Sequence, residues 1–139
     1  MKKKILVMGG AGFIGINIAK FLVNNRECEL TLADYEFTRD LSEYFTEQEI
    51  GSINFVQNDF TCPSAFAALD KDFDNVYMLA SVVGVNNTLE RPDEVIRINT
   101  SLIFNCLEWL KTTSVKRVLF TSTSETYSGT TEELDYPIP

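Results

Sequence analysis

Histidine is absent from the 139-residue sequence. This absence excludes a catalytic triad of the Ser-His-Asp type, histidine metal ligands and a histidine general base. Cysteine is also scarce: Cys28, Cys62 and Cys106 lie far apart, and no Cys-x-x-Cys pair occurs. An odd, dispersed set of this kind is typical of reduced thiols in a cytoplasmic protein and predicts no zinc site. We therefore expect a cytoplasmic protein without a metal centre.

Basic residues and long apolar runs are few as well. There are 12 Lys and Arg against 20 Asp and Glu, and the formal net charge of −8 argues against nucleic acid as a partner. The apolar stretch after Met1-Lys2-Lys3-Lys4 imitates a signal peptide, but a glycine cluster interrupts it. Hydrophobic residues make up 45% of the chain, as in globular proteins. We expect one globular domain over residues 1–139 that does not contact membranes.

The most informative stretch is the glycine cluster itself, Gly9-Gly10-Ala11-Gly12-Phe13-Ile14-Gly15. It follows an apolar run of strand length at residues 4–8, and the apolar residues after it recur at helical spacing. This pattern predicts a strand, a tight turn, and a helix from Gly12 to about Asn24. A glycine turn before a helix presents free backbone N–H groups and the positive end of the helix dipole, which together bind anions such as a pyrophosphate.

A carboxylate at the end of the second predicted strand strengthens this interpretation. Residues 29–33 have strand character, and Asp34 ends them, nineteen residues after Gly15. An acidic side chain at this position suits hydrogen bonding to both hydroxyls of an adenosine ribose. It would repel a 2′-phosphate, so the sequence favours NAD over NADP as the cofactor.

The remaining elements predict an α/β fold. Three further strands are expected over residues 52–56, 75–79 and 117–121, and helices over 41–48, 64–69 and 92–112. Alternating strands and helices specify a Rossmann-type doubly wound parallel sheet, for which we expect the strand order 3-2-1-4-5. The fifth strand then lies at an edge with unpaired backbone groups, so we also expect a homo-oligomer.

In such sheets, ligands bind beyond the carboxyl ends of the strands. The residues at these ends include Asp34, Asp59, Ala80 and the polar segment 121–125. Spacing alone leaves the role of that last segment open, because hydroxyl residues at a strand end also form turns and Glu125 also suits a solvated surface.

Several short motifs occur in a characteristic order along the chain. After the glycine cluster and Asp34 come Asn58-Asp59-Phe60, Leu79-Ala80-Ser81, Asn99 and Ser122-Thr123-Ser124-Glu125-x-Tyr127. Together they resemble the extended short-chain dehydrogenase/reductase family, which contains NAD-dependent nucleotide-sugar epimerases and dehydratases. The resemblance implies an NAD site made of Gly9, Gly12, Phe13, Ile14, Gly15, Asp34, Asp59, Phe60, Leu79, Ala80, Ser81 and Asn99.

The resemblance also implies individual roles. Asp59 and Phe60 match residues that flank the adenine, and Asn99 matches a helix Asn near the nicotinamide. Thr123 matches the catalytic Ser/Thr, which hydrogen-bonds the C4 oxygen of the sugar during hydride transfer. Ser124 and Glu125 complete the catalytic group, and a carboxylate at Glu125 is typical of 4,6-dehydratases and some decarboxylases. The implied mechanism is transient C4 oxidation of a nucleotide-linked sugar by bound NAD.

The sequence departs from the family pattern in three places. Met78 stands where the family often has His, and Tyr127-Ser128 stands where Tyr-Gly is usual. The catalytic Tyr-x-x-x-Lys pair occurs nowhere in the sequence, and the C-terminal substrate-binding region is missing. We therefore expect the NAD-binding portion of a nucleotide-sugar epimerase or dehydratase, inactive in this truncated form.

Two other functions stay open at this stage. The first is a non-catalytic module that binds or senses NAD, which the reading frame beyond Pro139 would distinguish. The second is a methyltransferase that uses S-adenosylmethionine, because such enzymes also combine a glycine turn with an acidic second-strand tip. The glycine spacing and the Ser122-Thr123-Ser124-Glu125 motif disfavour the methyltransferase.

Overall fold

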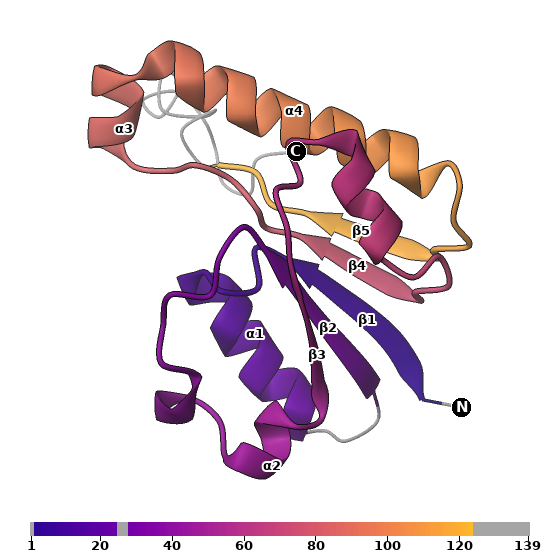
Figure 1. Ribbon diagram of the computed structural model, residues 1–139. Coiled ribbons are helices and arrows are strands. Elements are labelled where there is room, and N and C mark those ends of the chain that lie inside the picture. Colours follow the sequence, from indigo (N-terminus) through magenta and orange to yellow (C-terminus); the bar gives the residue numbers. More distant parts are fainter. Residues whose placement is uncertain (1, 25–27, 124–139) are drawn as a thin grey trace, which may run out of the picture.

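The computed structural model describes residues 2–24 and 28–123. Its centre is a five-stranded parallel sheet with the order β3-β2-β1-β4-β5 (Figure 1). The strands are β1 (Lys3–Met8), β2 (Cys28–Asp34), β3 (Ile53–Gln57), β4 (Asn75–Met78) and β5 (Arg117–Phe120). The predicted Rossmann-type order is confirmed. Because all strand pairs are parallel, the carboxyl ends of the five strands lie along the same side of the sheet, here called its carboxyl edge.

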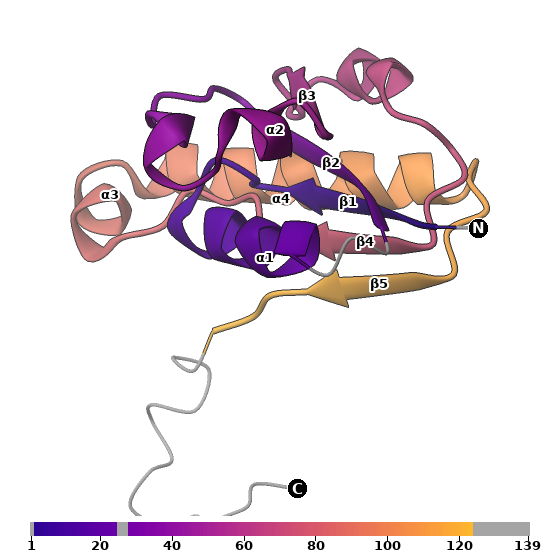
Figure 2. The same ribbon diagram turned by 90° about the horizontal axis from the view of Figure 1, so that it is seen from below.

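Two long helices cover opposite faces of the sheet. Figure 2 shows α1 (Phe13–Asn24) in front of the strands and α4 (Pro92–Leu110) behind them. Alternation along β1 divides the core accordingly, since Val7 packs on the α1 side and Leu6 on the α4 side. The buried residues of the α4 side include Leu6, Met8, Phe60, Phe66, Val76, Met78, Leu102, Cys106 and Trp109. Burial raises the pKa of the Cys106 thiol to about 11, so this cysteine is a core residue rather than a nucleophile.

The prediction of one continuous helix over residues 41–48 was wrong. The structure has a 3₁₀ turn, η1 (Leu41–Glu43), and a separate short helix, α2 (Glu47–Ile50). The break occurs because Thr46 caps a new helix: its hydroxyl accepts the Glu49 N–H at 3.3 Å, and the Glu49 carboxylate accepts the Thr46 N–H at 2.8 Å. This capping box outweighs the helical spacing that runs across it.

The short helix expected over residues 64–69 is confirmed as the 3₁₀ helix η2 (Pro63–Ala68). A further short helix, α3 (Val85–Glu90), precedes α4, and none was predicted there. It starts after Gly84, whose φ of 111° favours glycine, and it ends at Arg91 because the following Pro92 disfavours helical backbone there. No helix among the described residues is long and apolar enough to span a bilayer.

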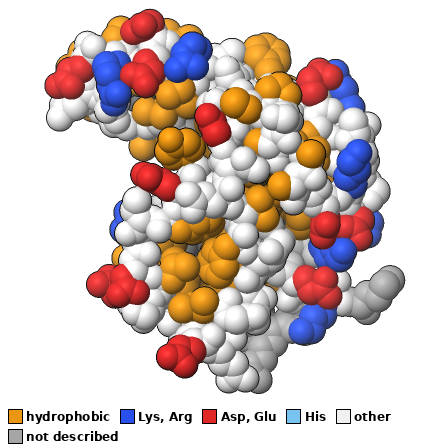
Figure 3. Space-filling view, viewed as in Figure 1, with side chains coloured by type: hydrophobic (Ala, Val, Ile, Leu, Met, Phe, Trp, Pro, Cys, Tyr) orange, Lys and Arg blue, Asp and Glu red, His pale blue; other side chains and the backbone are white. Residues whose placement is uncertain are grey.

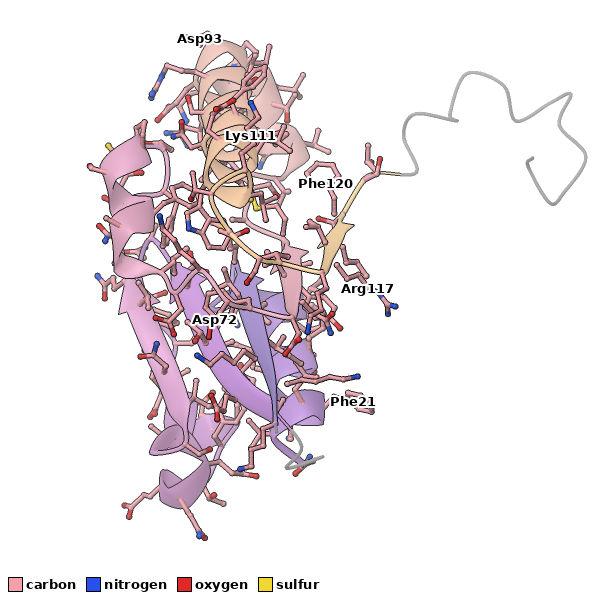
Figure 4. The ribbon with its side chains drawn as sticks, turned by 90° about the vertical axis from the view of Figure 1, so that its right-hand side faces the viewer. Phe21, Asp72, Asp93, Lys111, Arg117 and Phe120 are labelled. Carbon is pink, nitrogen blue, oxygen red and sulfur yellow. The ribbon has the colours of Figure 1, made fainter. Side chains whose placement is uncertain are left out.

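Strand β5 is exposed on both of its faces. Its apolar residues Val118, Leu119 and Phe120 are 44%, 48% and 55% exposed. Pairing with β4 places Val118 and Phe120 on the α4 side and Leu119 on the α1 side. Figure 4 shows Phe120 directed toward α4, with Arg117 pointing the other way. The predicted position at an edge is confirmed. Within residues 2–24 and 28–123, no strand pairs with the outer side of β5, and its apolar side chains are exposed.

We expect the chain to self-associate through this edge, because exposed apolar edge strands are templates for pairing. Val118→Lys should reduce the concentration-dependent increase in sedimentation coefficient, since a charge on an edge strand opposes pairing. Phe21→Lys is the matched control: Phe21 is 68% exposed but lies on α1, so its replacement should leave association unchanged. A wild-type protein that stays monomeric at high concentration would contradict the prediction.

Candidate functional site

Two neighbouring cavities lie along the carboxyl edge of the sheet. The first, here called the glycine-loop cavity, has a volume of about 690 Å³ and is bounded by residues of the glycine cluster, the start of α1 and the segment after β5. The second, the Asp34 cavity, has a volume of about 450 Å³ and lies between the ends of β2 and β3 and helix α4. Ala80 and Ser81 line both cavities, so the two form one continuous crevice. The surface is hollowed on this side of the molecule in Figure 3.

The turn after β1 requires glycine at specific positions. Gly9 has a φ of 83°, and a Cβ there would lie 2.7 Å from the backbone nitrogen of Ala80. A Cβ on Gly15 would collide with the carbonyl oxygen of Gly9. The N–H groups of Gly9 and Gly10 donate to the Ala33 carbonyl at 2.8 and 3.2 Å. These glycines therefore fix β1, β2, β4 and the start of α1 at close distances.

Gly12 differs from its neighbours because a Cβ there would meet a single atom of the protein. A Cβ there would meet only the Gly9 carbonyl oxygen, at 3.2 Å, and Gly12 lines the glycine-loop cavity. The first intrahelical bond of α1 runs from the Ile16 N–H to the Gly12 carbonyl. The N–H groups of Phe13, Ile14 and Gly15 have no acceptor within the described part of the chain, and these three residues line the same cavity. This arrangement fits an anionic group such as a pyrophosphate.

The Asp34 carboxylate is already engaged with the backbone. One oxygen accepts the Ala11 N–H at 2.8 Å, and the other accepts the Tyr35 N–H at 2.7 Å. The side chain therefore ties the end of β2 to the glycine turn, a structural role that the sequence did not predict. Each carboxylate oxygen can accept a further hydrogen bond, and Asp34 lines the cavity named after it. The geometry is compatible with binding a ribose diol.

The loop after β3 lies beside Asp34, because the Asn58 N–H donates to the Asp34 carbonyl at 2.9 Å. Phe60 is 3% exposed and packs edge-on against Phe66, with the ring centroids 5.1 Å apart. The Asp59 carboxylate accepts the N–H and the hydroxyl of Thr61, at 3.0 and 2.6 Å. Asn105 on α4 holds this loop, since its amide donates to the carbonyl of Thr61 at 2.8 Å. Asp59 and Phe60 both line the Asp34 cavity.

Asn99 holds the loop after β4. Its side-chain oxygen accepts the Val82 N–H at 2.7 Å, and its amide donates to the Val82 carbonyl at 3.0 Å. This paired contact ties Val82 to α4 and so places Ala80 and Ser81 between the two cavities. Asn99 lines the glycine-loop cavity, and its amide group positions the loop.

The structure describes only one of the three predicted catalytic residues. Thr123 lines the glycine-loop cavity beside Thr121 and Ser122. Thr121 anchors this segment, because its N–H and its hydroxyl both donate to the Met78 carbonyl, at 3.3 and 3.2 Å. Ser124 and Glu125 lie outside the described residues. The catalytic group therefore stays a prediction. Of its three residues, only Thr123 is described, and it lines the glycine-loop cavity.

Several lining residues escaped the sequence analysis. Tyr35 follows Asp34 directly, whereas Glu94, Arg97 and Ile98 come from α4 and line the Asp34 cavity. Their spacing along the helix places them on one face, next to Asn99. Helical spacing counted from Asn99 reaches Val95, Ile96, Leu102 and Ile103, so no local pattern in the sequence identifies these three residues.

Comparison with known proteins agrees with this geometry. The chain matches the model of the NAD dependent epimerase/dehydratase family over residues 5–138. It belongs to that family. NAD is the cofactor that the description of the family names.

Related family members act on UDP-sugars, according to their names. The chain is 35% identical over 127 residues to the UDP-N-acetyl-alpha-D-glucosaminuronate decarboxylase of Bacillus cytotoxicus, covering 91% of this chain and 38% of the relative. It is 32% identical over 133 residues to the UDP-glucuronate 4-epimerase of Thermodesulfobacterium geofontis, covering 89% of this chain and 40% of the relative. The chain thus spans about two fifths of the length of these family members.

Solved structures of epimerases have the same fold. A crystal structure of UDP-galactose 4-epimerase superposes with a TM-score of 0.73 at 29% identity, over 89% of this chain and 39% of that chain. The UDP-N-acetylglucosamine 4-epimerase of Methanobrevibacter ruminantium M1 gives a TM-score of 0.78 at 22% identity, over 99% of this chain and 44% of the other. The second likeness concerns the fold alone.

The surroundings of Gly12 lead to a prediction about cofactor binding by this family member. Gly12→Val should fold, because its Cβ makes one tight contact, with the Gly9 carbonyl oxygen at 3.2 Å, but should weaken NAD binding at least tenfold, or about 1.4 kcal/mol, because the side chain occupies the cavity. Isothermal titration calorimetry measures the affinity, and the melting temperature tests folding.

Gly51→Ala is the matched control for this variant. A Cβ on Gly51 would make only ordinary contacts at 3.5 and 3.7 Å, and Gly51 follows α2, so NAD affinity should not change. If Gly12→Val folds and binds NAD normally, the glycine cluster is a structural turn and no more.

Proposed function

We propose that this chain is the NAD-binding part of a nucleotide-sugar epimerase, dehydratase or decarboxylase. The observation that carries the proposal is the continuous crevice along the carboxyl edge, in which all twelve expected cofactor residues line one cavity or the other. The pyrophosphate would lie at Gly12 and the first turn of α1. The adenosine would enter the Asp34 cavity, and the nicotinamide would enter the glycine-loop cavity.

The sugar would be oxidised at the nicotinamide end of this crevice. NAD, when bound, accepts a hydride from C4 of the sugar and later returns it. The Thr123 hydroxyl would hydrogen-bond the C4 oxygen at the mouth of the glycine-loop cavity, and Ser124 and Glu125 would assist with proton transfer. Apolar side chains in this cavity, among them Val83, Ile103 and Phe120, would keep water away from the transferred hydride.

The substrate class follows from the relatives. The four proteins described above are named for UDP-linked sugars, and the sugars named for the two sequence relatives carry a carboxylate. A UDP-linked sugar is therefore the substrate we propose for the complete enzyme.

Cofactor choice gives a direct test of the site. We expect NAD to bind at least tenfold more tightly than NADP, about 1.4 kcal/mol, because Asp34 would accept the ribose hydroxyls and repel a 2′-phosphate. Asp34→Ala should lower the ratio of the NAD affinity to the NADP affinity. The ratio of the two affinities within one variant is informative even if the loss of the Ala11 contact weakens both.

Calorimetry with NAD, NADP and S-adenosylmethionine provides the measurement. Equal affinities for NAD and NADP in the wild-type protein would contradict the role of Asp34. Binding of S-adenosylmethionine in place of NAD would instead support the methyltransferase alternative.

Turnover is expected to require sequence beyond these 139 residues. The chain alone should convert neither UDP-glucose nor UDP-glucuronate, because it has no Tyr-x-x-x-Lys pair. A longer chain that supplies this pair should be active. In that longer chain, Thr123→Ala should lower kcat on the order of 100-fold, whereas Thr123→Ser should retain most activity because the hydroxyl stays.

Product analysis by anion-exchange chromatography tests this prediction. Steady turnover by mass-verified 139-residue protein would refute the inactivity. Unchanged kcat in the Thr123→Ala variant would remove Thr123 from the catalytic group.

A further inference from the structure

The Asp34 cavity has an uneven charge distribution. Three carboxylates line it, those of Asp34, Asp59 and Glu94, and Arg97 is the single cation among its lining residues. Acidic side chains also surround the hollow in Figure 3. A cavity with this charge disfavours the anionic pyrophosphate and suits an uncharged part of the cofactor, such as its base.

The three carboxylates already have partners, and Arg97 has none within residues 2–24 and 28–123. Asp34 accepts two backbone N–H groups, and Asp59 accepts from Thr61. Glu94 lies three residues before Arg97 on α4, but its carboxylate pairs with Arg91 at 3.0 Å. The Arg97 guanidinium is thus an unpaired cation at the rim of a cavity whose other ionic groups are engaged.

Apolar side chains also line this cavity. Phe60 comes from the loop after β3, whereas Ile98 and Leu102 come from α4, the helix that carries Arg97. A flat aromatic ring suits a cavity that offers both apolar surface and a planar guanidinium, because arginine stacks on aromatic rings and attracts their electron-rich faces. The free N–H groups of α1, which suit the pyrophosphate, line the other cavity. Arg97 is therefore assigned to a base rather than to a phosphate.

We propose that Arg97 binds the adenosine half of the cofactor, stacking its guanidinium on the adenine. The inference rests on the proposed NAD-binding function. With this role for Arg97, α4 contributes to the site in two ways. Asn99 positions the loop between the cavities, and Arg97, two residues earlier, covers the adenine. Loss of the guanidinium therefore weakens binding of the adenine and leaves the contacts of the nicotinamide in the glycine-loop cavity unchanged.

The test compares Arg97→Met with wild-type protein. Methionine keeps an unbranched apolar stem but removes the planar cation. The affinities for NAD and ADP-ribose, measured by calorimetry, should fall about three- to tenfold and by the same factor. The affinity for adenosine, which has no phosphate, should fall by that factor too when followed by NMR titration. Arg97→Lys should recover little, because an ammonium group does not stack.

Lys111→Met is the matched control. Lys111 follows α4, carries the same charge, pairs with Glu108 at 2.6 Å and lines neither cavity, so its replacement should leave all three affinities unchanged. Wild-type affinities in Arg97→Met would overturn the proposal. So would a loss for NAD with none for adenosine, or full recovery in Arg97→Lys, since either result would mean that the charge acts on phosphate. If the wild-type protein does not bind NAD at all, the proposed NAD-binding function is contradicted. This result differs from one in which the wild-type protein binds NAD and Arg97→Met binds it equally well, which contradicts only the role of Arg97.

Discussion

The close backbone approach at Gly9 is the constraint on which the carboxyl edge of the sheet depends. The Cα of Gly9 lies against Ala80, at the start of the loop after β4, and the carbonyl of Gly9 lies against Gly15 in α1. Strand, helix and neighbouring strand therefore meet without side chains between them. This arrangement brings the first turn of α1 and Ala80 to the two sides of one crevice. A larger residue would separate these elements and open the site at its centre.

Helix α4 supplies the second support of the site. Its inner face packs in the core through Leu102, Cys106 and Trp109. Polar side chains on flanking positions hold two loops: Asn99 binds the backbone after β4, and Asn105 binds the backbone after β3. The loops that line the crevice are thus fixed to a rigid helix by amide–backbone bonds, which preserves their geometry when a ligand enters.

The sequence predicted the architecture well because its signals are local and periodic. The glycine spacing and the apolar strands were enough for the strand order, and the ends of the strands indicated which residues would line the crevice. The sequence analysis missed the break before α2, although Thr46 and Glu49 carry the signature of a capping box. The pairing of Asn99 with Val82 and the place of Arg97 depend on how α4 lies against the loops, which no local pattern encodes. The roles of Ser124 and Glu125 stay predictions, since these residues lie outside the described part of the chain.

The double engagement of Asp34 limits how this protein can change over evolutionary time. The carboxylate that would recognise the ribose also accepts the Ala11 N–H of the glycine turn. If Asp34 is replaced by a residue without a side-chain acceptor, a shift of cofactor preference towards a 2′-phosphate therefore leaves a backbone donor of the turn unsatisfied. A second change would have to supply another acceptor for Ala11 first. Such an order of substitutions makes the preference for one dinucleotide difficult to lose, independently of how tightly that dinucleotide binds.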